Sequence, residues 1–221
     1  MDWDALRLSL QIGLTATALA VVVGVPLAWW IARLRSGWRE VASALVLVPM
    51  VLPPTVVGYY LLQAVGRRSA IGSVLEDVFG FSLVFDWTGA VLAAFVVSLP
   101  FLVRTVQAGF EATDRVYEEA ARTLGRSELS IFMTVAVPLA WRSVLAGVAL
   151  AFGRAIGEFG ATLMVAGNVP GSTRTMSIAI YEAVQTGRAS EAQVLALTLT
   201  LVTLGLLVAV GLAARRGPSW R

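Results

Sequence analysis

Residues 111–141 read EATDRVYEEAARTLGRSELSIFMTVAVPLAW and form the longest polar interruption in a mostly apolar chain. Acidic residues and arginines are mixed in its first part, and long hydrophobic runs lie on both sides of it. Charged side chains are costly inside a lipid bilayer, so a stretch of this kind is expected to lie in water. We therefore predict a helical hairpin outside the membrane, placed between two membrane-spanning segments.

The residue types predict how this hairpin is built. Asp114 is suited to cap the first helix, and Gly125 can adopt the left-handed conformation that ends it. Glu118 precedes Arg122 by four residues, the favourable order for an ion pair along one helix. Ser127 is suited to cap a second helix. These features leave two interpretations open: a solvated connector between spans, or a surface on which another protein docks.

Composition predicts an all-α polytopic membrane protein that forms one helical bundle. The chain has 221 residues, of which 57% are hydrophobic and 14% charged, whereas soluble domains have about 25% charged residues. The absence of cysteine and histidine excludes disulfides, thiol chemistry and histidine-based metal sites, and we predict no catalytic or metal-binding residues. All 17 basic residues are arginine, so the chain cannot contain a Walker A lysine. If ATP drives this protein, another subunit binds it.

Five segments are long and apolar enough to cross a bilayer, which takes roughly 20 residues. The first segment follows an acidic N-terminus that lacks the basic start of a signal peptide, so no cleavage is expected. Pro49, Pro53 and Pro54 are expected to kink the second segment. Short helices are expected in the outer segments 66–87 and 167–191, the second of them from Met176 to Gln185. The predicted membrane domain covers residues 8–214, with spans at residues 8–32, 41–65, 87–107, 143–166 and 192–214.

The distribution of arginines predicts the orientation of these spans. Ten arginines fall on the side of the hairpin: residues 33, 35, 39, 115, 122, 126, 142, 215, 216 and 221. Five fall on the opposite side: residues 7, 67, 68, 174 and 188. Because short cytoplasmic loops are enriched in basic residues, the hairpin and the C-terminus are predicted to be cytoplasmic and the N-terminus outside.

Charged residues within the spans have both structural and functional interpretations. Arg154 and Glu158 lie four residues apart in the fourth span, where an ion pair would offset the cost of burying them. The alternative is that the two residues gate a transport path. Arg104, in the third span, is close enough to the cytoplasmic end for its side chain to reach the membrane surface.

Part of the hairpin resembles the EAA loop of ABC importer permeases. Glu119-Ala120-Ala121 is followed after three residues by Gly125, and after nine more by Val135-x-Val137-Pro138. The family pattern is EAA, three residues, G, nine residues, I-x-L-P, so the only departures are two valines that preserve an apolar side chain. The resemblance implies a coupling helix that docks on a cytoplasmic ATPase subunit through Glu118, Glu119, Ala120, Ala121, Gly125 and Pro138.

Further stretches are similar to the molybdate-type permease subunits of this family. They are LPPTVVGYYLL (52–62), GRRSAIG (66–72), FDWTGAVLAA (85–94) and GEFGATLMVAGNVPGSTRT (157–175). The resemblance implies the type I importer permease fold and a location in the bacterial cytoplasmic membrane. It also implies a homodimer, two copies of an ATPase subunit that binds ATP and Mg, and an extracytoplasmic oxyanion-binding protein. No cofactor is expected in this chain and no nucleic-acid partner, and sulfate, thiosulfate or tungstate are alternative cargoes.

Transport of an oxyanion requires contacts weak enough to release it, for which neutral hydrogen-bond donors are suited. Candidates for the path or its gate are Thr55, Gly58, Tyr59 and Thr162, together with Arg154 and Glu158. Ordinary helix packing by small and hydroxyl residues is the alternative for each of the four neutral residues. The expected docking site for the external binding protein, or otherwise a plain turn, contains Asn168, Pro170, Gly171 and Arg174.

Two other functions are less consistent with the residues. A secondary transporter driven by an ion gradient usually shows inverted repeats and several buried acidic residues. In this sequence no repeat is evident, and Glu158 is the single acidic residue within the predicted spans. A membrane subunit of a redox complex is disfavoured by the absence of histidine and cysteine.

Overall fold

Helices make up all the regular secondary structure in the computed structural model, which describes residues 3–216. Side chains are described in this range except at Phe79 and residues 213–216. The long helices are α1 (Trp3–Arg33), α2 (Ser36–Val51), α5 (Trp87–Glu111), α9 (Trp141–Ile156) and α12 (Ala189–Arg216). The shorter ones are α3 (Pro54–Val65), α4 (Ala70–Phe79), α6 (Val116–Thr123), α7 (Glu128–Ile131), the π-helix η1 (Phe132–Ala136), α8 (Val137–Leu139), α10 (Gly160–Ala166) and α11 (Met176–Gln185). The predicted all-α class is confirmed, and α11 has the predicted bounds.

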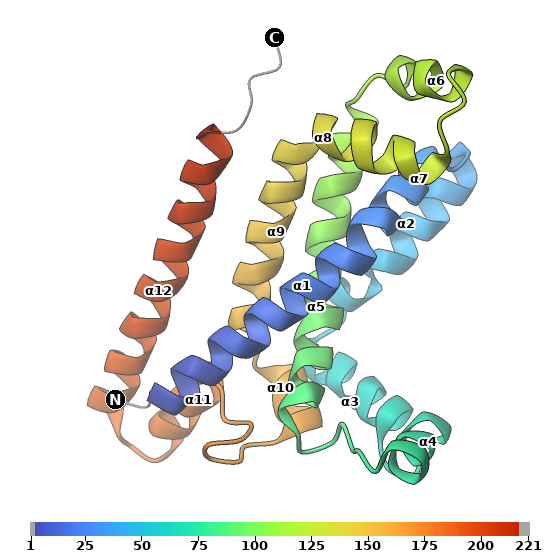
Figure 1. The fold of residues 1–221 in the computed structure, drawn as a ribbon. Helices are drawn as coiled ribbons and strands as arrows, with labels where there is room; N and C mark the ends of the chain where they lie inside the picture. The colour runs from blue at the N-terminus through green and yellow to red at the C-terminus, as the bar shows by residue number, and fades with distance from the viewer. Residues whose placement is uncertain (1–2, 217–221) are drawn as a thin grey trace.

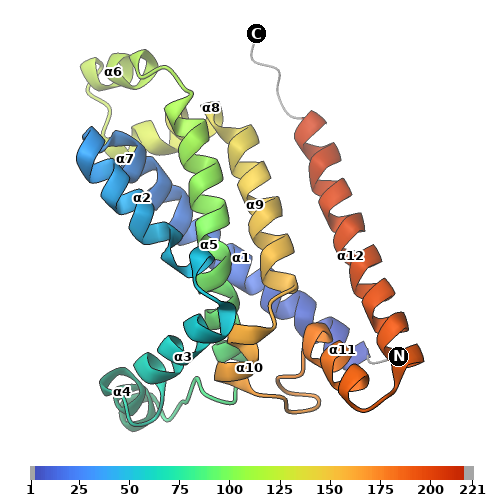
Figure 2. The ribbon, with the colours of Figure 1, turned by 180° about the vertical axis from the view of Figure 1, so that it is seen from behind.

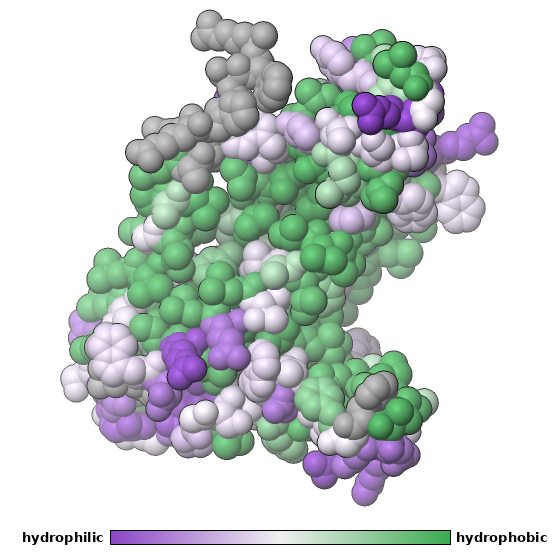
Figure 3. All heavy atoms as spheres, viewed as in Figure 1, coloured by the Kyte–Doolittle hydropathy of each residue, from purple (hydrophilic) through white to green (hydrophobic). Residues whose placement is uncertain are grey.

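On the face seen in Figure 3, apolar side chains cover most of the middle of the molecule, as expected for a protein surrounded by lipid. In the described residues, three helices are long and apolar enough to cross a membrane: α1, α5 and α12. Two bent helix pairs raise the number of candidate spans to five if each pair is counted as one span. One pair is α2 with α3, and the other joins residues 128–139 to α9.

The second predicted span, residues 41–65, is broken rather than kinked. Helices α2 and α3 meet at an angle of 105°. Leu52 and Pro53 are both extended, with ψ of 144° and 135°, because a residue before proline is driven out of the helical region. Pro54 then begins α3, at a position where a helix needs no backbone N–H. The bend leaves an indentation in the right-hand outline of the molecule between α2 and α3–α4 (Figure 3).

The fourth predicted span, residues 143–166, is not one continuous helix. Helix α9 ends at Ile156, and α10 begins only at Gly160. The carboxylate of Glu158 accepts a hydrogen bond from the backbone N–H of Ala161 at 2.7 Å, so the side chain satisfies a donor at the start of α10. The expectation that Arg154 and Glu158 share one helix is therefore wrong, because Glu158 lies in the break.

The core forms where α1, α5 and α9 cross (Figures 1 and 2). Small residues let these helices approach closely, which is how helices associate in lipid. A methyl group placed on Gly24 of α1 would lie 2.7 Å from Leu102 Cδ2 of α5, and one on Gly147 of α9 would lie 3.0 Å from Val106 Cγ2. Helix α12 stands to one side and packs mainly against α11 (Figure 1), where Leu195 is buried.

Functional regions lie at opposite ends of this core. Figure 1 shows α6 and α7 at one end, together with the end of α12, whereas α4, α10 and α11 lie at the other end with the beginning of α1. The hairpin and the end of α12 therefore lie at the same end of the described part of the chain. Arg221, used to predict the orientation, lies outside the described residues, as do the side chains of Arg215 and Arg216.

Helix α3 is held in its bent position by close contact with α10. Gly58 is buried against α10, and Gly160 faces the start of α3 near Pro54 and Thr55. A methyl group on Gly58 would lie 2.8 Å from Ala161 Cα, a backbone atom that cannot move without shifting α10.

Replacing Gly58 by alanine is expected to destabilise the protein by about 1–3 kcal/mol, because overpacking forces the two helices apart. Gly211→Ala is the matched control, since Gly211 is a helical glycine with no neighbour within 4 Å of an added methyl group. That control should be neutral or stabilising by up to about 1 kcal/mol, from higher helix propensity. Thermal unfolding in detergent measures both effects. If the two variants unfold at the same temperature, α3 does not need this contact.

Candidate functional site

In the hairpin at one end of the bundle, Ser127 caps α7 as predicted, whereas Arg115 occupies the N-cap position of α6, so the predicted cap Asp114 lies one residue too early. Asp114 accepts a hydrogen bond from the N–H of Val116 at 3.0 Å, and Ser127 accepts one from the N–H of Ser130 at 3.3 Å. Gly125 has a φ of +77°, the left-handed conformation that reverses the chain between α6 and α7. The resulting turn presents α6 at the edge of the molecule (Figure 1).

Arg122 ties the two helices of the hairpin together. Its guanidinium donates two hydrogen bonds to the carboxylate of Glu128, at 2.5 and 2.9 Å. These hydrogen bonds hold the pKa of Glu128 below its ordinary value and raise the pKa of Arg122. The predicted ion pair between Glu118 and Arg122 is therefore wrong, since Arg122 pairs across the turn instead of along its own helix.

Glu118 anchors the hairpin to the membrane domain. Its side chain is 8% exposed and forms a two-pronged ion pair with Arg33, the last residue of α1. Arg33 also donates to the carbonyl oxygen of Trp29 at 2.8 Å and lies 4.0 Å from the centre of the Trp29 ring. Arg115 adds a hydrogen bond of 2.7 Å to the carbonyl oxygen of Ala32. Glu118 thus fixes α6 to α1, and its side chain is buried instead of exposed on α6.

The other predicted docking residues lie mostly at the surface. Glu119, Ala120, Gly125 and Pro138 are exposed, and Ala121 is half-buried. Pro138 borders a cavity of about 290 Å³ between α6 and α8, lined also by Tyr117, Thr134, Val135 and Leu139. Sequence analysis missed Tyr117, although an aromatic residue on an otherwise polar helix is a recognisable signal of a binding surface.

A π-helix connects the hairpin to α9. In η1 the N–H of Val137 reaches the carbonyl oxygen of Phe132, five residues back. Pro138 has no N–H, and its ring would clash with the carbonyl four residues earlier in a regular α-helix, a clash that the wider turn relieves. The chain bends by 80° only after Leu139, between this segment and α9.

Only some of the residues predicted for the transport path lie close to one another. Arg154 Nη2 lies 2.7 Å from Glu158 Oε2, so the predicted ion pair is present. Thr55 faces Gly160, and Gly58 packs on Ala161, which brings the start of α3 to the start of α10. Thr162 is buried in α10. Tyr59 is instead exposed, and its hydroxyl oxygen accepts a hydrogen bond from Gln63 at 3.0 Å.

At the opposite end of the molecule, the predicted docking residues form an ordered turn. Val169 accepts hydrogen bonds at its carbonyl oxygen from the N–H groups of Ser172, Thr173 and Arg174. Pro170 and Gly171 are exposed at its tip.

The base of this turn is fixed by charged and polar side chains. Asn168 donates to Glu182 at 2.8 Å and accepts from Arg174 at 3.0 Å. Arg174 also forms an ion pair with Glu182 at 3.0 Å. Asn168 and Arg174 therefore hold the turn on α11, while Pro170 and Gly171 remain exposed at its tip.

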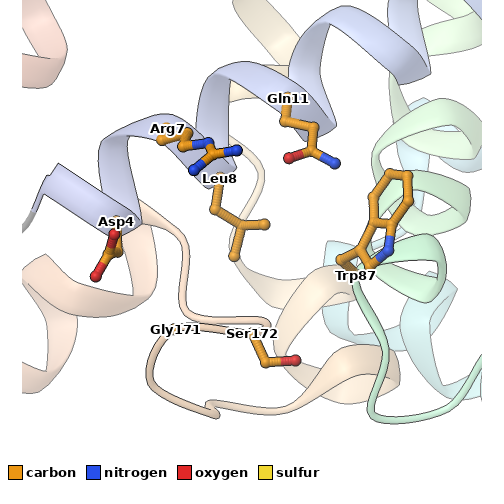
Figure 4. A pocket seen from close by; sticks show the side chains of 7 residues that line it. All are labelled: Asp4, Arg7, Leu8, Gln11, Trp87, Gly171 and Ser172. Carbon is orange, nitrogen blue, oxygen red and sulfur yellow. The ribbon is translucent and has the colours of Figure 1, made fainter.

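A polar cavity of about 310 Å³ adjoins this turn (Figure 4). It brings the N-terminal part of α1 beside the turn and the start of α5, a proximity that sequence analysis did not predict. Its lining residues are Asp4, Arg7, Leu8, Gln11, Trp87, Gly171 and Ser172.

Removal of the Glu118 charge is expected to loosen the hairpin. A hydrogen-bonded ion pair contributes about 1.5–3 kcal/mol, so Glu118→Gln should speed tryptic cleavage after the exposed Arg126 by about tenfold. Glu119→Gln is the matched control, because the neighbouring carboxylate is exposed and forms no ion pair with a described residue. Identical cleavage rates, measured by mass spectrometry, would mean that Glu118 does not anchor α6.

The buried ion pair predicts a non-additive pair of substitutions. Glu158→Gln leaves Arg154 without its partner and should lower the free energy of unfolding by about 2 kcal/mol. Adding Arg154→Gln removes the unpaired charge and should recover part of that loss. Thermal unfolding of the two variants in detergent tests this, and a double variant less stable than Glu158→Gln would contradict a pairing role.

Comparison with known proteins relates these features to a family. The sequence pattern of the family described as binding-protein-dependent transport system inner membrane component matches residues 24–216. The chain is 39% identical over 214 residues to the molybdenum transport system permease protein ModB of Escherichia coli K12, covering 96% of this chain and 93% of that protein. It is 40% identical over 195 residues to ModB of Azotobacter vinelandii, covering 88% and 86% of the two chains.

Solved structures share the fold at lower sequence identity. The MetNI methionine ABC transporter in inward-facing conformations matches with a TM-score of 0.76 at 16% identity, covering 97% of this chain and 95% of that one. A bacterial alginate ABC transporter, solved in complex with its alginate pentasaccharide-bound periplasmic protein, matches with a TM-score of 0.70 at 16% identity, covering 96% and 78%. The chain therefore belongs to the family of binding-protein-dependent transport system inner membrane components, the permease subunits of ABC importers.

Proposed function

We propose that this permease carries molybdate across the bacterial cytoplasmic membrane, as a homodimer bound to two copies of an ATPase subunit and served by an external oxyanion-binding protein. The anchored hairpin is the observation that carries the proposal, because it offers a rigid surface to a partner in water. The molybdenum permeases, which are about 40% identical, support the choice of cargo.

The hairpin can transmit movement because it follows α5 through residues 112–115 and is connected to the bundle at two further points. The ion pair between Glu118 and Arg33 links α6 to the end of α1. Helix η1 and helix α8 link α7 to the beginning of α9. A displacement of the hairpin by a closing ATPase dimer would therefore move α1 and α9 together.

Movement of α9 reaches the proposed gate at its other end. Glu158 lies two residues after the end of α9, pairs with Arg154 and satisfies the N–H of Ala161 at the start of α10. Helix α10 in turn packs on α3 at Gly58. Thr55 and Thr162, which lie on these two helices, are the neutral donors that we assign to the oxyanion path.

The hairpin and the C-terminus are cytoplasmic in this proposal, and the N-terminus is outside. The turn with Pro170 and Gly171 then faces the external binding protein, with Asn168 and Arg174 fixing its base. ATP and Mg bind to the partner subunit, because this chain contains no lysine for a Walker A loop.

Reconstitution in liposomes with the ATPase subunit and the binding protein tests this function. Uptake of molybdate should require ATP and the ATPase subunit, and molybdate should stimulate ATP hydrolysis more than sulfate or tungstate does. Uptake that continues without the ATPase subunit would identify an ion-driven transporter instead. Stronger stimulation by sulfate or by tungstate would assign that other cargo.

Gly125→Val tests the coupling role of the hairpin. A β-branched residue is strained at a φ of +77°, so the turn should distort and transport should fall at least about tenfold while membrane insertion is retained. Gly187→Val is the matched control, since Gly187 is exposed, has a φ of +75° and lies in the opposite turn between α11 and α12. Glu119→Arg, which reverses an exposed charge on α6, should also uncouple ATP hydrolysis from uptake. Normal transport by Gly125→Val and Glu119→Arg would show that the hairpin is only a connector.

A further inference from the structure

A groove of about 450 Å³, lined by both polar and apolar side chains, lies between α2 and α5, near the hairpin end of the bundle. It extends from Glu111, at the end of α5, to Arg104, which lies about 10 Å deeper because seven residues at 1.5 Å each separate the two. We call it the α2–α5 groove, and its lining includes Arg39, Ser43, Ala44, Arg104, Gln107 and Glu111.

Gln107 organises this groove from a buried position. It is 2% exposed on a membrane-spanning helix, where an amide is costly unless it is hydrogen-bonded. Its Oε1 accepts from Arg104 Nη1 at 3.1 Å, and its Nε2 donates to Ser43 Oγ at 3.1 Å and to Glu111 Oε1 at 2.9 Å. One buried side chain therefore orients the arginine and joins α5 to α2.

Arg104 is the unpaired cation of the groove. Within residues 3–212, it forms no ion pair, whereas Arg154, the other arginine within a predicted span, is paired with Glu158. Arg104 is also exposed. Because an uncompensated charge within a span is costly, Arg104 must face water or an anion that this chain does not supply.

The other charges around Arg104 keep the groove close to neutral. Arg39 forms an ion pair with Glu111 at 3.6 Å, which leaves little free charge on either residue. Glu40, which also lines the groove, is within 3.5 Å of Ser36 Oγ. A bound anion would thus be attracted by one guanidinium, with a carboxylate near enough to limit its affinity.

We propose that Arg104, positioned by Gln107, binds the transported oxyanion in the α2–α5 groove, on the inner part of its path. A guanidinium presents five N–H donors in a planar fork that fits two oxygens of a tetrahedral oxyanion, and Gln107 occupies only one of them. A site with a single arginine and a nearby carboxylate binds the anion weakly enough for release into the cytoplasm. This assignment depends on the proposed transport of an oxyanion.

A lipid phosphate offers the same tetrahedral chemistry to Arg104. The lining favours the dissolved anion, because both walls of the groove carry polar or charged side chains. Lipid-facing helix surfaces are apolar instead, as in the exposed leucines of α12 at positions 197, 201 and 204. The proposal therefore commits to the transported anion.

Arg104→Gln tests the site in the reconstituted complex with the ATPase subunit and the binding protein. Losing one charged, bidentate contact should lower the rate of molybdate uptake per assembled complex by about tenfold. Arg104→Lys, which keeps the charge without the fork, should have an intermediate rate. Arg68→Gln is the matched control, since Arg68 is exposed outside the spans, and it should transport normally. A wild-type rate for Arg104→Gln would overturn the site, whereas absence of uptake by the unchanged protein would instead overturn the proposed function.

A second measurement leaves Arg104 in place. Because the chain has no cysteine, Ala44→Cys introduces a single thiol into the groove, on α2. With cysteine-free partner subunits, a water-soluble thiol reagent should label this residue, and molybdate should slow the labelling. A lipid-filled groove would leave the thiol unlabelled, and a lipid phosphate on Arg104 would make labelling insensitive to molybdate. Either result would overturn the proposal.

Discussion

Close contact between helices that carry small residues is the constraint on which this structure depends. In lipid there is no hydrophobic force to bring apolar helices together, so association relies on packing at short range. Gly24 against Leu102 and Gly147 against Val106 provide that packing between α1, α5 and α9. The hairpin, the two broken spans and the outer turn are all connected to these three helices. The positions of these parts relative to one another therefore depend on the same contacts.

The break in the second predicted span and the break in the fourth lie side by side and stabilise each other. The break before Pro54 places the start of α3 beside Gly160, and the break after Ile156 places the start of α10 there as well. Free backbone groups at membrane depth must be satisfied within the protein. Glu158 meets this need at Ala161 while its charge is balanced by Arg154. Non-helical backbone and buried charge are therefore stabilised by one side chain.

Similarity to MetNI at 16% identity concerns the fold alone, whereas identity of about 40% to molybdenum permeases concerns a much narrower group of proteins. Neither kind of similarity specifies how the parts are connected in this chain. The contacts at Glu118, Glu158 and Gln107 do, because each joins elements whose relative movement transport would require.

Sequence alone determined the features that depend on local chemistry. Hydrophobic runs located the helices. The hairpin was specified by Asp114, Gly125 and Ser127. The spacing from Glu119 to Pro138 identified the family. Only the tertiary structure decided which distant residues meet. Glu118 pairs with Arg33, 85 positions away, instead of with Arg122 on its own helix, and consecutive prolines produced a full break where a kink was expected. These outcomes depend on which helices pack together, and a pattern within one helix carries no information about its neighbours.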